Sequence, residues 1–104
     1  MYQIIVLYGV PTDSEAFDQY YKDVHIPLVQ KMPHLKSFSV SEGPITIIGG
    51  GGPYYRIALL GYEDLKSLED SQYSSEGMKA SMDAANFATG GMTALVMEVK
   101  DSLQ

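Results

Sequence analysis

Two side chains that can transfer protons lie one helical turn apart in the first third of the sequence. Tyr21 precedes His25 by four residues in a predicted helix, so the phenol and the imidazole can meet on one side of it. Histidine titrates near neutral pH, and an imidazole at the mouth of a cavity is suited to general acid–base catalysis. His25 and Tyr21 are therefore the candidate catalytic residues. The alternative is a structural histidine that bonds the backbone carbonyl left without a donor by Pro27.

Aromatic and acidic side chains elsewhere could line the same cavity. Phe17 and Tyr20 share the apolar stripe of the predicted helix, and Asp83 and Phe87 lie near the end of a later helical stretch. Asp83 is the one carboxylate among small apolar residues, although such a residue more often lies on a solvated edge. For Tyr20 and for Tyr21 alike, a core or interface aromatic is the more common role. We take these four residues, Phe17, Tyr20, Asp83 and Phe87, as candidate substrate-binding residues.

Several other chemistries lack their motifs. The sequence has no cysteine, two histidines and no His-Glu-x-x-His spacing, so neither a metal nor a metal cofactor is expected. No Gly-x-Ser-x-Gly elbow is present, and His34 is expected at the surface. Residues Gly49 to Gly52 lead through Pro53 into a strand and lack a following Lys-Ser/Thr, which favours a flexible connection over a phosphate loop.

Charge and length bound the class of protein. The net charge is −6 with only seven lysines and arginines, so binding to nucleic acid or to an anionic membrane is not expected. The apolar N-terminus is too short to span a bilayer and has no basic flank or cleavage site, which predicts a strand and a cytoplasmic protein. The length predicts one domain over residues 1–104.

The candidate catalytic residues lie between a predicted strand and a loop. Tyr2 to Tyr8 is almost continuously apolar and predicts a strand buried on both faces. Thr12 or Asp13 is expected to cap the following helix, whose apolar residues recur at helical spacing. Pro27 interrupts this run, so we expect a kink or a break near His25 and a last turn that ends at Met32.

The remaining sequence predicts three strands and a second helical region. Strands are expected at 35–41, with a possible extension at 45–48, at 54–62 and at 92–99, followed by a polar tail from 101 to 104. Helical stretches are expected to open at Asp64 and after Ser74, the second with Met78, Met82 and Ala85 on one face. The methionines suit either a soft cavity lining or ordinary core packing. The order is βαββαβ, which predicts a ferredoxin-like α+β sandwich with two helices on one face of a four-stranded antiparallel sheet.

The alternation in the central strands predicts a partner. Both alternating sets of side chains in residues 2–8 and 54–62 are largely apolar. The helices of a two-layer domain cover only one face of the sheet, so the other face would expose a large apolar patch. A second copy stacked on that face is the simplest cover, and we expect a homodimer.

Two segments resemble the motifs of a known family. Residues 17–28, followed by Pro33 and Leu35, resemble the first-helix motif of the EthD family, and residues 83–87 resemble its second motif. The resemblance implies a dimeric α+β barrel in which two ferredoxin-like protomers stack their sheets around a cavity. The matched positions that it marks as important, without assigning roles, are Tyr21, His25, Pro27, Asp83 and Phe87.

The function of this family is poorly defined, and similar barrels include cofactor-free monooxygenases, lactone isomerases, polyketide cyclases and haem-degrading enzymes. The leading expectation is a small-molecule-binding protein or cofactor-free enzyme that holds an apolar, carbonyl- or aromatic-bearing metabolite, with His25 as acid/base and Tyr21 as its hydrogen-bonding partner. One alternative is a non-catalytic accessory or carrier protein of a catabolic pathway. A further alternative is a haem-binding barrel with His25 as axial ligand.

Overall fold

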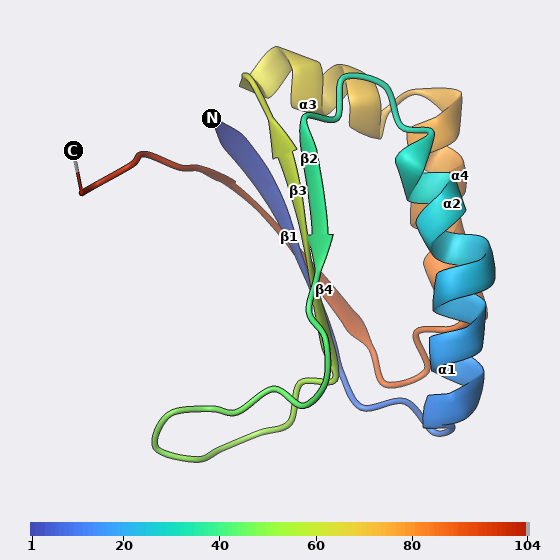
Figure 1. Ribbon diagram of the computed structural model, residues 1–104. Coiled ribbons are helices and arrows are strands. Elements are labelled where there is room, and N and C mark those ends of the chain that lie inside the picture. Colours follow the sequence, from blue (N-terminus) through green and yellow to red (C-terminus); the bar gives the residue numbers. More distant parts are fainter. Residues whose placement is uncertain (104) are drawn as a thin grey trace.

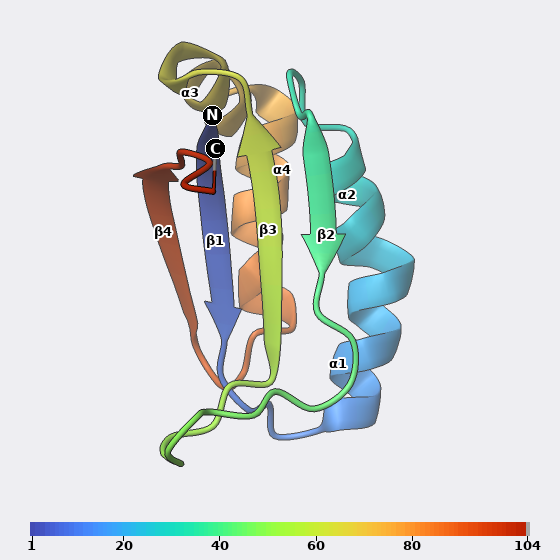
Figure 2. The same cartoon turned by 60° about the vertical axis from the view of Figure 1, so that its left-hand side comes forward.

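The structure is a computed structural model that describes residues 1–103 (Figure 1). Runs rich in Val, Ile, Leu and Tyr form a four-stranded antiparallel sheet in the order β2-β3-β1-β4. The strands are β1 (Tyr2–Tyr8), β2 (Ser37–Val40), β3 (Arg56–Tyr62) and β4 (Met92–Glu98). Figure 2 shows the strands side by side with the helices behind them. The predicted ferredoxin-like fold is confirmed.

The first helical region is continuous, which corrects the expected kink or break. It consists of α1 (Ser14–Tyr20), the π-helical turn η1 (Tyr21–His25) and α2 (Ile26–Gln30). The Asp13 side chain accepts a hydrogen bond from the backbone N–H of Ala16 and caps α1, as predicted. The backbone N–H of Ile26 bonds the carbonyl of Tyr21, so the chain widens by one residue before Pro27 instead of breaking there.

The second helical region comprises α3 (Leu65–Gln72), α4 (Ser75–Asp83) and the 3₁₀ turn η2 (Ala84–Asn86). Asp64 and Ser74 cap the two helices, as their sequence positions predicted. The buried face of α4 is formed by small residues and Asp83, whereas Met78 and Met82 are 46% and 70% exposed. The methionine face of this helix is therefore neither core nor cavity lining.

The connection between β2 and β3 is longer than expected. Residues 45–48 are not a strand, and β3 begins at Arg56 instead of Tyr54. Gly49, Gly50 and Gly51 have positive φ angles, a backbone conformation that glycine adopts without strain. Figure 1 shows this connection and the C-terminal tail on the side of the sheet away from the helices. The predicted tail ends at Gln104, which lies outside the described residues.

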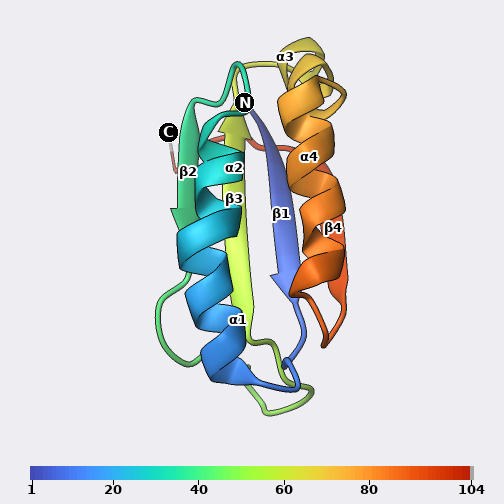
Figure 3. The same cartoon turned by 90° about the vertical axis from the view of Figure 1, so that its right-hand side faces the viewer.

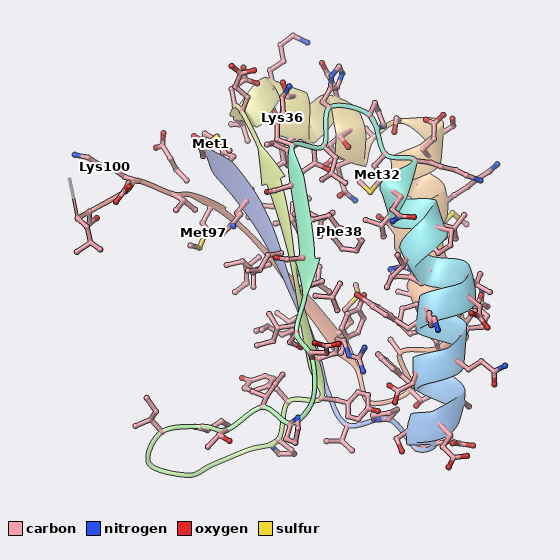
Figure 4. The ribbon with its side chains drawn as sticks, viewed as in Figure 1. Met1, Met32, Lys36, Phe38, Met97 and Lys100 are labelled. Atoms are coloured by element: carbon pink, nitrogen blue, oxygen red, sulfur yellow. The ribbon has the colours of Figure 1, made fainter. Side chains whose placement is uncertain are left out.

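The register separates two faces of the sheet. On the face toward the helices, Ile4 lies beside Leu60 and Val96, and Val6 lies beside Ala58 and Ala94. The opposite face, called the open face below, carries apolar side chains and no helix; its apolar members are Ile5, Leu7, Ile57, Leu59, Leu95 and Met97. Figure 4 shows Met32 and Phe38 between the two layers and Met97 on the open face.

The layer between sheet and helices contains two packed groups. An aliphatic group surrounds Ile4, Leu60 and Val29, and an aromatic group surrounds Tyr8, Phe17 and Tyr21. These two groups hold the side chains of the candidate site between sheet and helices. In the described part of the chain, no helix is long and apolar enough to cross a membrane.

Candidate functional site

The aromatic group forms a rigid wall beside the first helical region. Phe17 and Tyr21 stack with their ring centroids 5.4 Å apart, and Tyr8 meets both rings edge-on. Phe87, from the segment after η2, packs edge-on against Phe17 and Tyr21. Such pairs favour one relative ring orientation, so side chains from distant segments are held in fixed positions.

The π-turn places His25 inside this wall. The imidazole was expected at the mouth of a cavity, but it is almost fully buried, with 5% of its surface exposed. The His25 ring lies between Tyr21 and Phe87, with centroid distances of 5.3 and 4.6 Å. π-turns recur at functional sites because the extra residue changes the direction of the side chains that follow. Tyr21 therefore packs its ring against His25 and is not one of the hydrogen-bond partners found for it.

Those hydrogen-bond partners are Asp83 and Tyr8. Nδ1 of His25 lies 3.0 Å from Oδ2 of Asp83, and both side chains are buried. The other carboxylate oxygen, Oδ1, accepts hydrogen bonds from the Tyr20 hydroxyl at 2.6 Å and from Nδ2 of Asn86 at 3.0 Å. Each carboxylate oxygen of Asp83 thus has a partner. This arrangement also differs from the structural alternative, in which His25 would bond a free carbonyl.

The pKa of the Asp83 carboxyl reflects opposing effects. Burial raises it, but the hydrogen bonds from Tyr20, Asn86 and His25 together outweigh burial and leave the pKa below its ordinary value. The carboxylate is therefore ionised at neutral pH and can only accept. Nδ1 of His25 must then carry the proton, which leaves Nε2 as an unprotonated nitrogen.

This free nitrogen faces a phenol. The Tyr8 hydroxyl lies 3.5 Å from Nε2, at the far end of the hydrogen-bonding range. Burial, assisted by the neighbouring Tyr21, raises the pKa of Tyr8 well above its ordinary value, so this phenol remains protonated. Burial also lowers the pKa of His25 below 6.5, while its bond to Asp83 and the carboxylate charge act in the opposite direction. At neutral pH the pair consists of a neutral base and a protonated donor.

A cavity of about 80 Å³ adjoins this pair, with space for several water molecules. His25, Tyr8 and Tyr21 line one part of it, and most of the remaining lining is apolar. Four alanines from the sheet and from the second helical region leave the space open: Ala58, Ala80, Ala84 and Ala94. The cavity lies between sheet and helices, and not on the open face where stacked sheets would meet.

Arg56 adds a positive charge at the edge of the aromatic group. Its guanidinium lies 5.4 Å from the ring centroid of Tyr21 and 5.6 Å from that of Phe17. Nη2 donates to Asp18 at 2.8 Å, and the Tyr55 hydroxyl donates to the same carboxylate at 2.7 Å. The arrangement fixes the start of β3 against α1, and no motif in the sequence predicted it.

The structure brings all six candidate residues together. Tyr21 and His25 line the cavity, whereas Phe17 and Phe87 pack behind them. The Tyr20 hydroxyl donates to Asp83, and Asp83 in turn bonds His25; neither Tyr20 nor Asp83 lines the cavity. Sequence reasoning missed Tyr8, although the alternation of β1 places it on the same face as Ile4.

It also missed Asn86, which lies one helical turn after Asp83 and bonds its carboxylate. The signal for this residue was its spacing of three from Asp83.

The sequence matches the model of the EthD domain over residues 10–91. An uncharacterised 11.0 kDa protein from the thcB–thcC intergenic region of Rhodococcus erythropolis is 38% identical over 96 residues, 91% of each chain. The crystal structure of an ethyl tert-butyl ether D family protein of Bacillus halodurans is 31% identical, with a TM-score of 0.87 over 96% of this chain and 99% of the other.

More distant structures share the fold. SnoaB of Streptomyces nogalater, a cofactor-independent oxygenase, is 7% identical with a TM-score of 0.68 over 98% of this chain and 95% of its own. A dimeric ferredoxin-like protein of unknown function from Thermobifida fusca is 13% identical with a TM-score of 0.69, over 94% of this chain and 90% of its own. At these identities the likeness shows the fold alone.

Proposed function

The chain belongs to the EthD family, and we propose that it binds a small apolar carbonyl compound beside His25 and removes a proton next to the carbonyl. The observation that carries this proposal is the buried imidazole, whose Nδ1 is fixed by Asp83 and whose Nε2 faces Tyr8 at the cavity. A base of this kind is worth roughly 10²–10⁴ in rate. No cofactor enters the proposed reaction.

The proposed step conserves its atoms and charges. Nε2 of His25 takes a proton from the carbon next to the carbonyl. The electron pair of that C–H bond forms a C=C bond, and the π pair of the carbonyl moves to its oxygen, which gives an enolate. In the proposed step, the Tyr8 hydroxyl, kept protonated by burial, donates a hydrogen bond to this oxygen. Asp83 stabilises the imidazolium without taking its proton. Return of the proton to the same or another atom gives exchange or isomerisation, and attack of the enolate on a second carbonyl gives cyclisation.

A carrier without turnover is the second candidate. It is favoured by the small number of polar groups in the cavity, which suits storage of an apolar molecule as well as its conversion. Haem binding fits the site poorly. The cavity beside Nε2, about 80 Å³, has space for several water molecules and not for a macrocycle.

We further propose that two copies associate through the open face. The proposal is supported by the apolar side chains of Ile5, Leu59 and Leu95 on that face and by relatives described as dimeric. Leu95 is 45% exposed in the single chain, which an apolar interface would cover. Each copy would retain its own cavity, because the cavity lies on the other side of the sheet.

The exchange of carbon-bound hydrogen tests the enzymatic proposal without knowledge of the natural substrate. In D₂O at neutral pH, ¹H NMR follows the replacement of the protons next to the carbonyl of 2-pentanone. We expect the protein to accelerate this exchange above an imidazole buffer of equal concentration. His25→Asn keeps an amide near Nδ1 for Asp83 but removes the basic nitrogen, so it should lower the rate by about 10²-fold or more.

The matched control is His34→Asn, because His34 is exposed and its φ of 66° is one that asparagine tolerates. This variant should leave the rate unchanged. Binding of 2-pentanone without exchange would identify a carrier. Equal rates for the His25→Asn variant and the unaltered protein would overturn the role of His25.

A further inference from the structure

The side of β4 that faces the helices is left uncovered. Strand alternation and register place Met92 beside Tyr8, Ala94 beside Val6 and Val96 beside Ile4, all on the side of the sheet that faces the helices. On the two central strands this side is largely buried, yet Met92 and Val96 are 42% and 55% exposed. The three residues Met92, Ala94 and Val96, called the β4 strip below, therefore form an apolar surface that the helices do not shield.

The β4 strip continues into the cavity. Met92 and Ala94 belong to the cavity lining, together with Ser81 of α4, and all three residues are exposed. The lining residues from β1, β3 and α2 are mostly buried, so the cavity opens to solvent between α4 and β4. Figure 3 shows these two elements together at the side of the molecule away from α1 and β2.

The strip begins next to the proposed reacting groups. Met92 pairs with Tyr8, whose hydroxyl lies 3.5 Å from Nε2 of His25. From this point the strip runs along the strand to Val96, four residues further on and roughly 13 Å away at the usual rise of a strand. Glu98 follows two residues later and lies on the same face by alternation. A molecule lying on the strip would have one end at His25 and an uncharged middle along the apolar side chains. Its far end would carry no anionic group, because Glu98 would repel one.

We infer that the β4 strip is a ligand subsite for the apolar tail of an elongated carbonyl compound. The inference rests on the proposed function and extends it by assigning the shape of the ligand. The carbonyl end lies at His25 and Tyr8, the first carbons fill the cavity, and the remaining chain passes between α4 and β4 onto the strip. Met92 suits this position because its unbranched thioether adapts to different chains, and Ala94 leaves room beside it.

Two ketones that differ only in length test the subsite. Binding of 2-pentanone and 2-nonanone is measured by titration of the amide NMR signals, under the same conditions. Each added methylene that becomes buried should tighten binding about fourfold, so the four extra methylenes of 2-nonanone should tighten it on the order of a hundredfold. A ligand confined to the cavity would gain little beyond the length that fills it.

Substitutions on the strip test whether the tighter binding of 2-nonanone arises there. Val96→Asp places a charge on the strip outside the cavity lining and should weaken 2-nonanone at least tenfold while changing 2-pentanone less than twofold. Val96→Thr keeps the β-branched shape, and it serves as a second variant in case the aspartate disturbs the strand. It should also weaken 2-nonanone more than 2-pentanone, but by a smaller factor than Val96→Asp. Leu65→Asp is the control, because Leu65 is a comparably exposed aliphatic residue on α3 and lies outside the cavity lining.

The outcomes separate this inference from the proposed function. A long-chain preference that Val96→Asp and Val96→Thr reduce, and Leu65→Asp does not, supports the subsite. Tight binding of 2-pentanone with no gain for 2-nonanone, or a gain that both Val96 variants retain, overturns the subsite and leaves the site at His25 standing. Amide shifts showing a second copy seated on the strip of the free protein also overturn it. Failure of both ketones to bind overturns the subsite and the proposed function together.

Discussion

The two faces of the sheet differ in what they need from outside the chain. On the helix side, His25, Asp83 and Tyr8 come from three separate segments, and their contacts are complete within one copy. On the open face, the central side chains Ile5 and Leu59 lie beside each other and beside the edge strands, but no helix covers them. Under the two proposals, the chemistry of a protomer is self-contained, whereas its stability depends on a second copy.

The largest expected effect comes from a charge on the open face. Leu59→Lys places an ammonium at the centre of the proposed interface, where it would be buried without a partner. We expect the dimer to dissociate and the melting temperature to fall by roughly 10 °C or more, because a loss of about 2 kcal/mol has this effect in a domain of this size.

Light scattering measures the dissociation: the mass should fall from about twice the 11.4 kDa of one chain to the mass of one chain. Ser39→Lys, at the edge strand on the same face, is the matched control and should have a small effect. If the unaltered protein is already a monomer at micromolar concentration, the proposed dependence on a second copy is wrong.

A lesion on the helix side should lower the stability of the chain but leave its assembly unchanged. Asp83→Ala removes the acceptor of Tyr20, Asn86 and His25, and buried groups left unpaired cost about 1–3 kcal/mol. Chemical denaturation measures this loss, while light scattering should still show the dimer. Asn86→Ala, which removes only one donor from the partly exposed side, is the control and should cost less. Dissociation of the dimer by Asp83→Ala would show that the two faces are not independent.

The smallest expected effect is a pH dependence of stability that originates at His25. Burial lowers the pKa of this imidazole in the folded state below the 6.5 of the unfolded chain. Between these two values the unfolded chain binds more protons than the folded chain, so the free energy of unfolding falls as the pH falls through this window. Denaturation curves from pH 7.5 to 5 should show this slope. His25→Asn should reduce this slope; an unchanged slope in His25→Asn would assign the effect elsewhere.

Much of the fold could be predicted from periodicity and caps. Asp13, Asp64 and Ser74 were identified from their positions before apolar runs, and each caps its helix. The extents of the strands were less accurate, since residues 45–48 are apolar but lack a strand partner. Local sequence sets the propensity of a segment, whereas pairing depends on whether a neighbouring strand is within reach.

The site itself could be predicted only in part. Residue types and the family motifs singled out His25 and Asp83, but not that they meet, because 58 residues separate them. Met82 is apolar but 70% exposed, whereas the next residue, Asp83, is charged and buried. Hydrophobicity alone therefore predicts the wrong burial for both residues. The π-turn at 21–25 also escaped prediction, because the choice between i−4 and i−5 hydrogen bonds depends on the packing around the helix.

The central claim is that His25 presents an unprotonated Nε2 to the cavity, while its protonated Nδ1 donates a hydrogen bond to the Asp83 carboxylate. Long-range ¹H–¹⁵N NMR correlations of the histidine rings report the tautomer and the pKa of each imidazole in one titration. We predict the Nδ1-protonated tautomer for His25 at pH 7, a pKa below 6.5, and a shift of Nε2 when 2-pentanone is added. Protonation of Nε2 at neutral pH, or a pKa above 6.5, would contradict the account.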